Sequence, residues 1–586
     1  MGCSAHVVPV VKINIPSKAN LPDMWDDIQP DFPMPSPRPY QAEALSVIRW
    51  ALDNDDFDNI VVEAPTGIGK SAIAMTVQKW FASSYLLTPS LGLTEQYNRD
   101  YSHLLKEIKG RSNFPCWVRE GTADGAPCWS KNRSCLHTKR EDPCPYFEQK
   151  FEAADSSLVL SNPAYLFRII QGDRNFGQRE FAIIDEAHDM EGFLMDFLET
   201  RITLRDYSLI HGRTTNFPIH YHAADWIDPI KELHEGAQAE LENAEDAEDE
   251  QAIERFRNLL SKTTTLLELL KDPERVVIEN HADGGGRYLK VRPVRIDKFA
   301  ADKLESLSMR RMFLSATILD IDTFINSLGL QDQRTLFVRI SQSPFPKDNL
   351  KIIYSPCGPM SYAKRDNSIP KQIKAIAAIM EKNPKKRGVI LPHSHYIRKK
   401  IVEGLREMGF GDRIITHDSD ARSRDVAIKH FFKGDDPSLV LISTYVGQGF
   451  DFKGKLAEWL VICKVPFLPI KGDPVIEQRL TEDEHSWRQK YEDTPDCPYE
   501  PPSKYSNGLC GSFTCSAPCK TWYQMQTALK LVQGAGRLIR TPTDKGELFI
   551  LDGSWARFAR HNSHLLPSWF RTSIQDPPNW LKRALM

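Results

Sequence analysis

The chain has 586 residues and a formal net charge of −3, from 75 Lys and Arg against 78 Asp and Glu. This balance excludes a polycation that coats nucleic acid with its whole surface, so any nucleic-acid binding must be local. Hydrophobic residues make up 41% and charged residues 26%, which excludes a disordered acidic chain and a bundle of membrane helices. The length corresponds to roughly three to five domains.

The chain has eleven cysteines, an odd number, and no long apolar run. Residues 1–20 lack the pattern of a secretory signal, so we expect no secretory leader. A disulfide framework is therefore not expected, and metal or cluster ligation is the better hypothesis for the cysteines. We expect a soluble intracellular protein of the cytoplasm or nucleoid, or of the nucleus in a eukaryote, with no membrane association.

Short apolar runs followed by Gly, Pro or Asp and a helical pattern recur along the chain, which is typical of α/β domains with a parallel sheet. The predicted strands of a first series are 59–63, 85–88, 157–160, 181–184 and 312–314. Those of a second series, which begins after about residue 335, are 388–391, 438–442, 459–462 and 548–551. The pattern predicts two α/β domains.

Three segments interrupt this pattern. Residues 112–147 are rich in Cys, Pro, Gly and charge, and residues 470–520 are again rich in Pro and Cys. Residues 230–275 are charged and helical in composition, with an acidic stretch from Glu240 to Glu254 that we expect to be a solvated helix face. The segment at 470–520 is expected to be an insertion in the second α/β domain.

A glycine-containing loop joins the predicted strand at 59–63 to a predicted helix over 72–81. Gly67 and Gly69 let backbone N–H groups turn onto phosphate oxygens, Lys70 can reach the β- and γ-phosphates, and the Ser71 hydroxyl can ligate Mg²⁺. The strand–loop–helix context predicts a site for ATP and Mg²⁺. The predicted nucleotide contacts of the loop are Ala64, Pro65, Thr66, Gly67, Ile68, Gly69, Lys70 and Ser71.

The sequence Asp185-Glu-Ala-His188 ends the predicted strand at 181–184. Ligands of a parallel sheet bind outside the carboxyl ends of its strands, which places these carboxylates beside the phosphate loop. We predict that Asp185 holds Mg²⁺ through its water shell and that Glu186 orients and polarises the attacking water.

The sequence Gln533-Gly-Ala-Gly-Arg-Leu-Ile-Arg540 follows a predicted helix over 522–532. Arg537 and Arg540 are three residues apart, a spacing that places both on one face of a helix. A planar, permanently charged guanidinium suits the stabilisation of charge on a transferring phosphoryl group. We predict that both arginines act on the phosphates from the second α/β domain.

The order of these motifs resembles that of superfamily 2 helicases with a DEAH box, which have two RecA-like motor domains. Arg38-Pro-Tyr-Gln41 resembles the adenine-recognition motif of that family, and Thr88 to Gln96 resembles its first DNA-contacting motif. Ser315-Ala-Thr317 resembles the motif that couples the ATP state to strand movement, and Ser443 to Asp451 resembles the fifth motif, with Gln448 where Glu is usual. Gln533 to Arg540 resembles the sixth motif. The resemblance implies these further nucleotide-site residues: Arg38, Gln41, Gly449, Asp451 and Gln533.

Four cysteines lie between the first DNA-contacting motif and the DEAH box: Cys116, Cys128, Cys135 and Cys144. Four soft thiolates can hold Zn²⁺ or an iron–sulfur cluster, and the alternative of unliganded cysteines also stays open on the residues alone. The position resembles that of the [4Fe-4S] domain in the XPD/DinG family, and Cys144 to Phe147 resembles the sequence at its last ligand. The resemblance implies a [4Fe-4S] cluster held by these four cysteines.

The XPD/DinG resemblance also implies a domain plan, an α/β fold in which an iron–sulfur cluster domain and a helical arch are inserted in the first of two motor domains. The first motor domain would comprise 1–111, 154–225 and 301–330, the cluster domain 112–153 and the arch 226–300. The second motor domain would comprise 331–586 with the insertion at about 470–520. One departure is Pro163, which stands where the family has His.

The implied function is that of a monomeric ATP-dependent helicase of DNA repair that moves 5′ to 3′ on single-stranded DNA and unwinds forked DNA. One alternative is an ATP-driven translocase or remodelling subunit without strong unwinding, and another is a non-catalytic scaffold. The intact Lys70, Glu186 and Arg537 argue against the scaffold. RNA is compatible as a substrate, because motors that track a backbone discriminate weakly. No motif identifies a protein that loads the motor.

A second cysteine group lies within the predicted insertion: Cys497, Cys510, Cys515 and Cys519. The surrounding segment is rich in Pro, Gly and Ser and lacks an apolar core of its own, and such modules usually need a metal or a covalent staple. Zn²⁺ held by four thiolates is the main hypothesis. Free cysteines, a second cluster and a disulfide are the alternatives.

Overall fold

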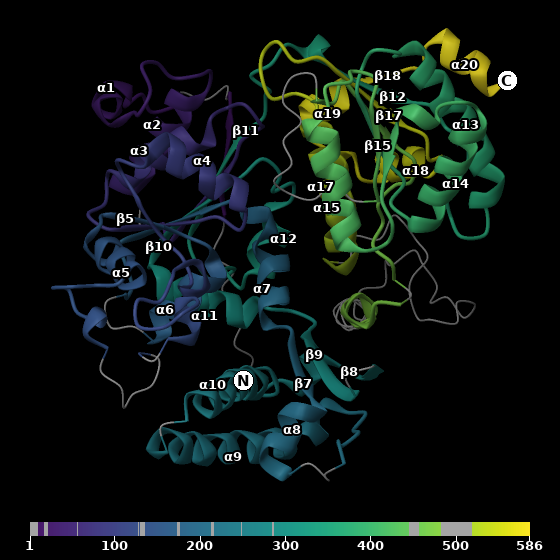
Figure 1. Cartoon of the computed structure of the whole chain (residues 1–586). Helices are drawn as coiled ribbons and strands as arrows, with labels where there is room; N and C mark the ends of the chain where they lie inside the picture. The colour runs from purple at the N-terminus through teal and green to yellow at the C-terminus, as the bar shows by residue number, and fades with distance from the viewer. Residues whose placement is uncertain are drawn as a thin grey trace, which may run out of the picture.

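The computed structural model contains two α/β units that lie side by side and a smaller unit that extends away from both (Figure 1). The residues that it describes are 10–16, 21–54, 57–126, 128, 135–172, 176–212, 216–247, 249–283, 286–444, 456–470, 472–481 and 518–586. Among these residues, no helix combines the length and the apolar character that crossing a membrane requires.

The first α/β unit is built on an eight-stranded parallel sheet with the order β1-β11-β2-β10-β6-β3-β5-β4. Successive residues of β2 enter opposite cores, since Ile60 and Val62 pack in one apolar cluster and Val61 in another. Helices therefore cover both faces, as in other parallel sheets. The strands are β1 (Val11–Ile15), β2 (Asn59–Glu63), β3 (Ser84–Leu87), β4 (Lys106–Ile108), β5 (Leu158–Ser161), β6 (Phe181–Asp185), β10 (Arg310–Ser315) and β11 (Thr335–Ile340).

The register of this sheet aligns the ends of three strands. Ser315 of β10 is paired with Glu63 of β2, and Leu314 is paired with Asp185 of β6. The phosphate loop, the DEAH box and the Ser315 motif therefore begin at the same edge. The helices of the unit are α1 (Trp25–Ile28), α2 (Gln41–Asn54), α3 (Lys70–Gln78), α4 (Leu91–Tyr101), α5 (Pro145–Asp155), α6 (Pro163–Gly172), α7 (Met190–Leu198), α11 (Asp297–Leu307) and α12 (Ile321–Ser327).

The second α/β unit has a seven-stranded parallel sheet with the order β14-β15-β13-β16-β17-β12-β18. Two parallel sheets confirm the two α/β domains that the sequence predicted. The strands are β12 (Leu350–Tyr354), β13 (Gly388–Leu391), β14 (Ile414–Thr416), β15 (Val440–Ile442), β16 (Trp459–Ile462), β17 (Gly546–Ile550) and β18 (Ile574–Gln575). The helices are α13 (Arg365–Lys382), α14 (His395–Glu407), α15 (Ala421–Lys433), α17 (Pro518–Gly536), α18 (Trp555–His561), α19 (Ser568–Thr572) and α20 (Asn579–Leu585).

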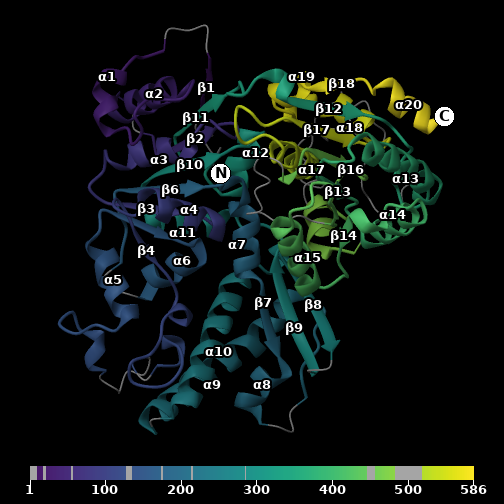
Figure 2. The ribbon, with the colours of Figure 1, turned by 45° about the horizontal axis from the view of Figure 1, so that its top comes forward.

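The third unit, at the bottom of both views, combines three strands with a helical hairpin (Figure 1, Figure 2). It packs around its own core, in which Trp226 and Leu289 are fully buried. The acidic stretch lies where the hairpin turns, and its carboxylates at Glu240 and Glu254 are exposed as expected for a solvated face. Its elements are β7 (Thr200–Thr203), α8 (Leu204–His211), α9 (Ile227–Asp246), α10 (Glu250–Leu269), β8 (Val276–Asp283) and β9 (Gly286–Pro293).

Candidate active site

The phosphate loop connects β2 to α3 through two glycines in left-handed conformations, Gly67 with φ 90° and Gly69 with φ 89°. A Cβ on Gly69 would lie 2.5 Å from the Gln41 amide nitrogen, and one on Gly67 would lie 2.0 Å from the Phe345 ring. Both positions therefore require glycine, for conformation and for space. Ala64 and Ile68 are buried in the core, and Lys70 opens α3.

The segment Arg38 to Gln41, which resembles an adenine-recognition motif, contacts this loop directly. Arg38 Nη1 donates to the Gly67 carbonyl at 2.7 Å, and Gln41 Nε2 donates to the Gly69 carbonyl at 3.1 Å. The backbone N–H of Arg38 donates in turn to Gln41 Oε1 at 2.6 Å. Two residues that lie about 30 positions before the loop in sequence therefore fix its shape.

Asp185 ends β6, and both of its carboxylate oxygens accept hydrogen bonds. The backbone N–H of Glu186 donates to Oδ1 at 2.9 Å, and the Tyr97 hydroxyl donates to Oδ2 at 2.8 Å. Burial and the charge of Glu186 raise the pKa of Asp185, whereas the charge of Lys70 lowers it. Glu186 has a φ of 51°, and its side chain lines the cleft between the two α/β units.

His188 joins three motifs. Its Nδ1 lies 2.8 Å from Ser315 Oγ, and its Nε2 lies 2.5 Å from the side-chain amide nitrogen of Gln533, which comes from the second α/β unit. Burial lowers the pKa of His188, but the charges of Asp189 and Glu186 outweigh it, so the net pKa is raised. The imidazole therefore connects the DEAH box to both the Ser315 motif and the sixth motif.

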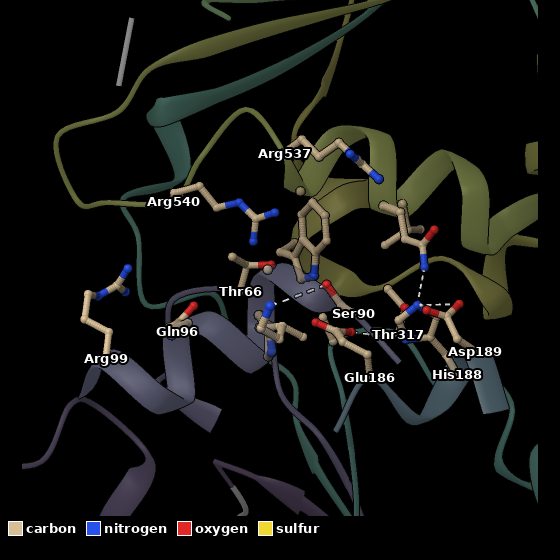
Figure 3. A pocket seen from close by; sticks show the side chains of 18 residues that line it. Thr66, Ser90, Gln96, Arg99, Glu186, His188, Asp189, Thr317, Arg537 and Arg540 are labelled. Atoms are coloured by element: carbon tan, nitrogen blue, oxygen red, sulfur yellow. Dashed lines mark hydrogen bonds and ion pairs between the residues drawn. The ribbon is translucent and has the colours of Figure 1, made fainter. Parts of the chain in front are cut away.

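Arg537 and Arg540 face the first α/β unit across the cleft, opposite Thr66 and Glu186 (Figure 3). Their predicted placement on one face of a helix is wrong, because α17 ends at Gly536. The chain leaves the helix through a tightened turn, and Asp544 Oδ2 then accepts from the backbone N–H of Arg540 at 2.9 Å. The irregular segment nevertheless brings both guanidinium groups to the cleft.

Three further cleft residues were not predicted from the sequence. Arg99 comes from α4, Asp189 directly follows the DEAH box, and Trp569 comes from α19, far beyond the sixth motif. Of these three residues, only Asp189 could have been predicted from the sequence, because it directly follows His188. Pro65, a predicted nucleotide contact, also lines the cleft, whereas Gly449 and Asp451 lie outside the described residues.

The first cysteine group converges on one hollow of the structure, lined by Cys116, Cys128, Cys135 and Cys144. Arg111 also lines this hollow and donates from Nη1 to Cys128 Sγ at 3.3 Å. Burial raises the pKa of Cys135, and the other three thiols raise it further. Within the described part of the chain, no three His, Cys, Asp or Glu side chains are arranged to hold a single metal ion.

The second cysteine group cannot be placed in the same way. Cys497, Cys510 and Cys515 lie outside the described residues, and for Cys519 only the backbone, in α17, is described. The zinc site stays a prediction.

Two family models match the chain. Residues 34–195 match the res subunit of type III restriction enzymes, and residues 376–573 match a helicase C-terminal domain. The ATP-dependent DNA helicase YoaA of Haemophilus influenzae is 21% identical over 93% of this chain and 93% of its own length. A probable ATP-dependent helicase of Methanocaldococcus jannaschii is 24% identical over a region that covers 33% of this chain and 34% of that protein.

Solved structures share the fold. An XPD helicase superposes with a TM-score of 0.58 at 13% identity, covering 93% of this chain and 100% of that one. Xpd4 of S. tokodaii superposes with a TM-score of 0.54 at 14% identity, covering 92% and 100%.

Proposed function

Since the chain belongs to the XPD/DinG-like superfamily 2 helicases, we propose that it moves 5′ to 3′ along single-stranded DNA and unwinds forked DNA. The observation that carries the proposal is the cleft between the two α/β units. One wall supplies Glu186 and the phosphate loop, and the other supplies Arg537 and Arg540. Phosphoryl transfer needs positioning and charge stabilisation from both sides of the phosphates, and these residue types provide them.

In this function, Lys70 and the loop amides would bind the β- and γ-phosphates, with Arg38 and Gln41 at the adenine. Glu186 would orient and polarise the attacking water, and the two arginines would stabilise the charge on the transferring group. Ser71 and Asp185 would hold Mg²⁺, which neutralises phosphate charge when bound. The nucleotide would therefore complete a site whose halves lie on separate units.

The contact of His188 with Gln533 supports coupling between hydrolysis and movement of the two units. Gln533 belongs to the second unit, and Ser315, at the other nitrogen of the imidazole, ends β10 of the first. Loss of the γ-phosphate would change the position of the DEAH box and, through His188, the closure of the cleft. Cycles of closure would draw a bound strand across the units.

We further propose that the four cysteines at the hollow hold a [4Fe-4S] cluster in a domain over 112–153. Four thiols around one hollow are the donor set that such a cluster requires. Trp117 lies on this segment with 52% of its surface exposed, and Arg119 is exposed close by. An exposed aromatic ring beside a cation suits stacking and backbone contact with a single strand. The segment 226–300 would form the arch that encloses the strand.

Two tailed substrates test the function with the full chain. We expect ATP hydrolysis that single-stranded DNA stimulates, and unwinding of a fork with a 5′ tail but not of one with a 3′ tail. Lys70→Ala should abolish both activities, whereas Lys79→Ala, at the exposed far end of the same helix, should retain them. ATP hydrolysis without separation of either fork would identify a translocase instead, and hydrolysis without stimulation by DNA would contradict the motor.

A further inference from the structure

Tyr97 places a phenol against Asp185, one of the two residues that would hold Mg²⁺. Its hydroxyl donates to Asp185 Oδ2 at 2.8 Å. Only 1% of the Tyr97 surface is exposed. The phenol is therefore a buried group beside Asp185 rather than a surface group, although no motif of the sequence includes it.

The helix that carries Tyr97 directly follows the start of the segment that resembles the first DNA-contacting motif. α4 begins directly after Ser90, whose side chain caps it, and it follows the segment from Thr88 that resembles the first DNA-contacting motif. Gln96 and Arg99 of the same helix line the cleft, whereas Tyr97 points to β6 and enters the buried core. A strand that binds at this segment and displaces α4 would move the phenol relative to Asp185.

We propose that Tyr97 is a positioning residue that couples binding of a single strand to binding of Mg²⁺-nucleotide, an inference that rests on the proposed motor function. Its hydrogen bond fixes the orientation of the Asp185 carboxylate. With that orientation lost, the carboxylate can rotate and its hold on the metal-bound waters weakens. Because coupling between two ligands is reciprocal, the strand and the nucleotide change the affinity of each other by the same factor.

Tyr97→Phe tests the proposal, since it removes the hydroxyl and keeps the ring. The matched control is Tyr85→Phe, because Tyr85 is also buried in the first sheet and its hydroxyl donates to the Gly177 carbonyl at the same 2.8 Å. Binding of a fluorescent, non-hydrolysable ATP analogue is measured by titration of Mg²⁺, with and without a single-stranded oligonucleotide. Binding of the oligonucleotide alone shows that each variant is folded.

In the wild type and in Tyr85→Phe, we expect the oligonucleotide to change the affinity for the analogue by about fivefold or more. In Tyr97→Phe, we expect the oligonucleotide to change the affinity for the analogue by less than about twofold. We also expect half-saturation of the protein with the analogue to require about tenfold more Mg²⁺ than in the wild type. Oligonucleotide binding without nucleotide should be unchanged. Retained coupling in Tyr97→Phe overturns the inference and leaves the motor function standing. Absence of coupling in the wild type overturns the motor function, and the inference with it.

If Tyr97→Phe does not fold, hydrogen exchange of the wild type tests the proposed coupling instead. We expect the Mg²⁺-bound analogue to slow hydrogen exchange of the α4 amides over 91–101, with α13 of the second unit as the reference. The single strand should alter protection of the same amides. Unchanged exchange in α4 with both ligands would overturn the inference.

Discussion

Arg479 and Glu191 form a buried ion pair between the two α/β units, with Nη1 2.5 Å from Oε1 and with 3% and 10% of their side chains exposed. Trp522 Nε1 donates to the other oxygen of Glu191 at 3.0 Å, and the Arg479 guanidinium lies 3.8 Å from the centre of the Trp522 ring. Glu191 lies on α7, three residues beyond His188, and Trp522 lies on α17, which leads to Arg537. The ion pair and the Trp522 hydrogen bond therefore connect α7, which follows the DEAH box, to α17, which leads to Arg537.

Glu191→Ala should destabilise the contact between the units, because it leaves the Arg479 charge buried without its partner. Removal of one member of a buried pair costs about 3–5 kcal/mol. Asp53→Ala, which breaks an exposed pair with Arg49 on α2, should cost at most about 1 kcal/mol. The free energy of the first unfolding transition in denaturant is the measurement. Equal losses in the two variants would show that the buried pair contributes no more than a surface pair.

Arg537→Lys should reduce the rate of ATP hydrolysis about 10³-fold or more while ATP binding persists. Lysine keeps the positive charge but lacks the planar fork that matches the oxygens of a transferring phosphoryl group. Arg560→Lys on α18, an exposed arginine, is the control and should hydrolyse ATP at the wild-type rate. Single-turnover hydrolysis with saturating single-stranded DNA separates the chemical step from binding. A wild-type rate in Arg537→Lys would remove this residue from the chemistry.

Cys135→Ser should lose the iron of the purified protein, because each thiolate at the hollow would ligate one iron of the cluster. Cys357→Ser is the matched control, since Cys357 is also a free cysteine and lies buried in the second unit. We expect about four irons per chain in the wild type and in the control. The iron content of anaerobically purified samples decides the question. Zinc in place of iron in the wild type would contradict the cluster.

The nucleotide motifs could be predicted from sequence because their signal is local. A strand, a glycine turn and a helix follow one another within about twenty residues, and the structure places Gly67 and Gly69 in the left-handed conformations that such a turn requires. The carboxylates of the DEAH box follow a buried strand in the same way. The end of α17 was not predicted in the same way, and the prediction that Arg537 and Arg540 lie on one face of a helix is wrong because α17 ends at Gly536.

Long-range partners could not be predicted. Arg311 is 1% exposed inside β10. Its Nε donates to Asn59 Oδ1 at 3.0 Å on the neighbouring strand, and its Nη2 donates to Gln333 Oε1. The Tyr97 hydroxyl meets Asp185 for the same reason, since 88 residues separate them and only the strand order brings them together. Both side chains look ordinary until the register of the sheet is known.

His393 should make the stability of the second unit depend on pH. It follows β13 with a φ of 51°, and burial together with the charges of Lys530 and Lys464 lowers its pKa to about 4. In the unfolded chain the imidazole has a pKa of about 6.5. Between these values the unfolded state binds a proton and the folded state does not. The contribution of His393 to stability is therefore complete above about pH 6.5 and is lost as pH falls towards 4.

His393→Asn isolates this effect, because asparagine tolerates a positive φ and does not titrate. The free energy of unfolding of the wild type minus that of the variant should fall by up to about 3 kcal/mol between about pH 7.5 and pH 4. Taking this difference cancels the carboxylates that titrate in both proteins. Denaturant unfolding at several pH values gives the two curves. Parallel curves over the whole range would mean that His393 is protonated equally in the folded and unfolded states.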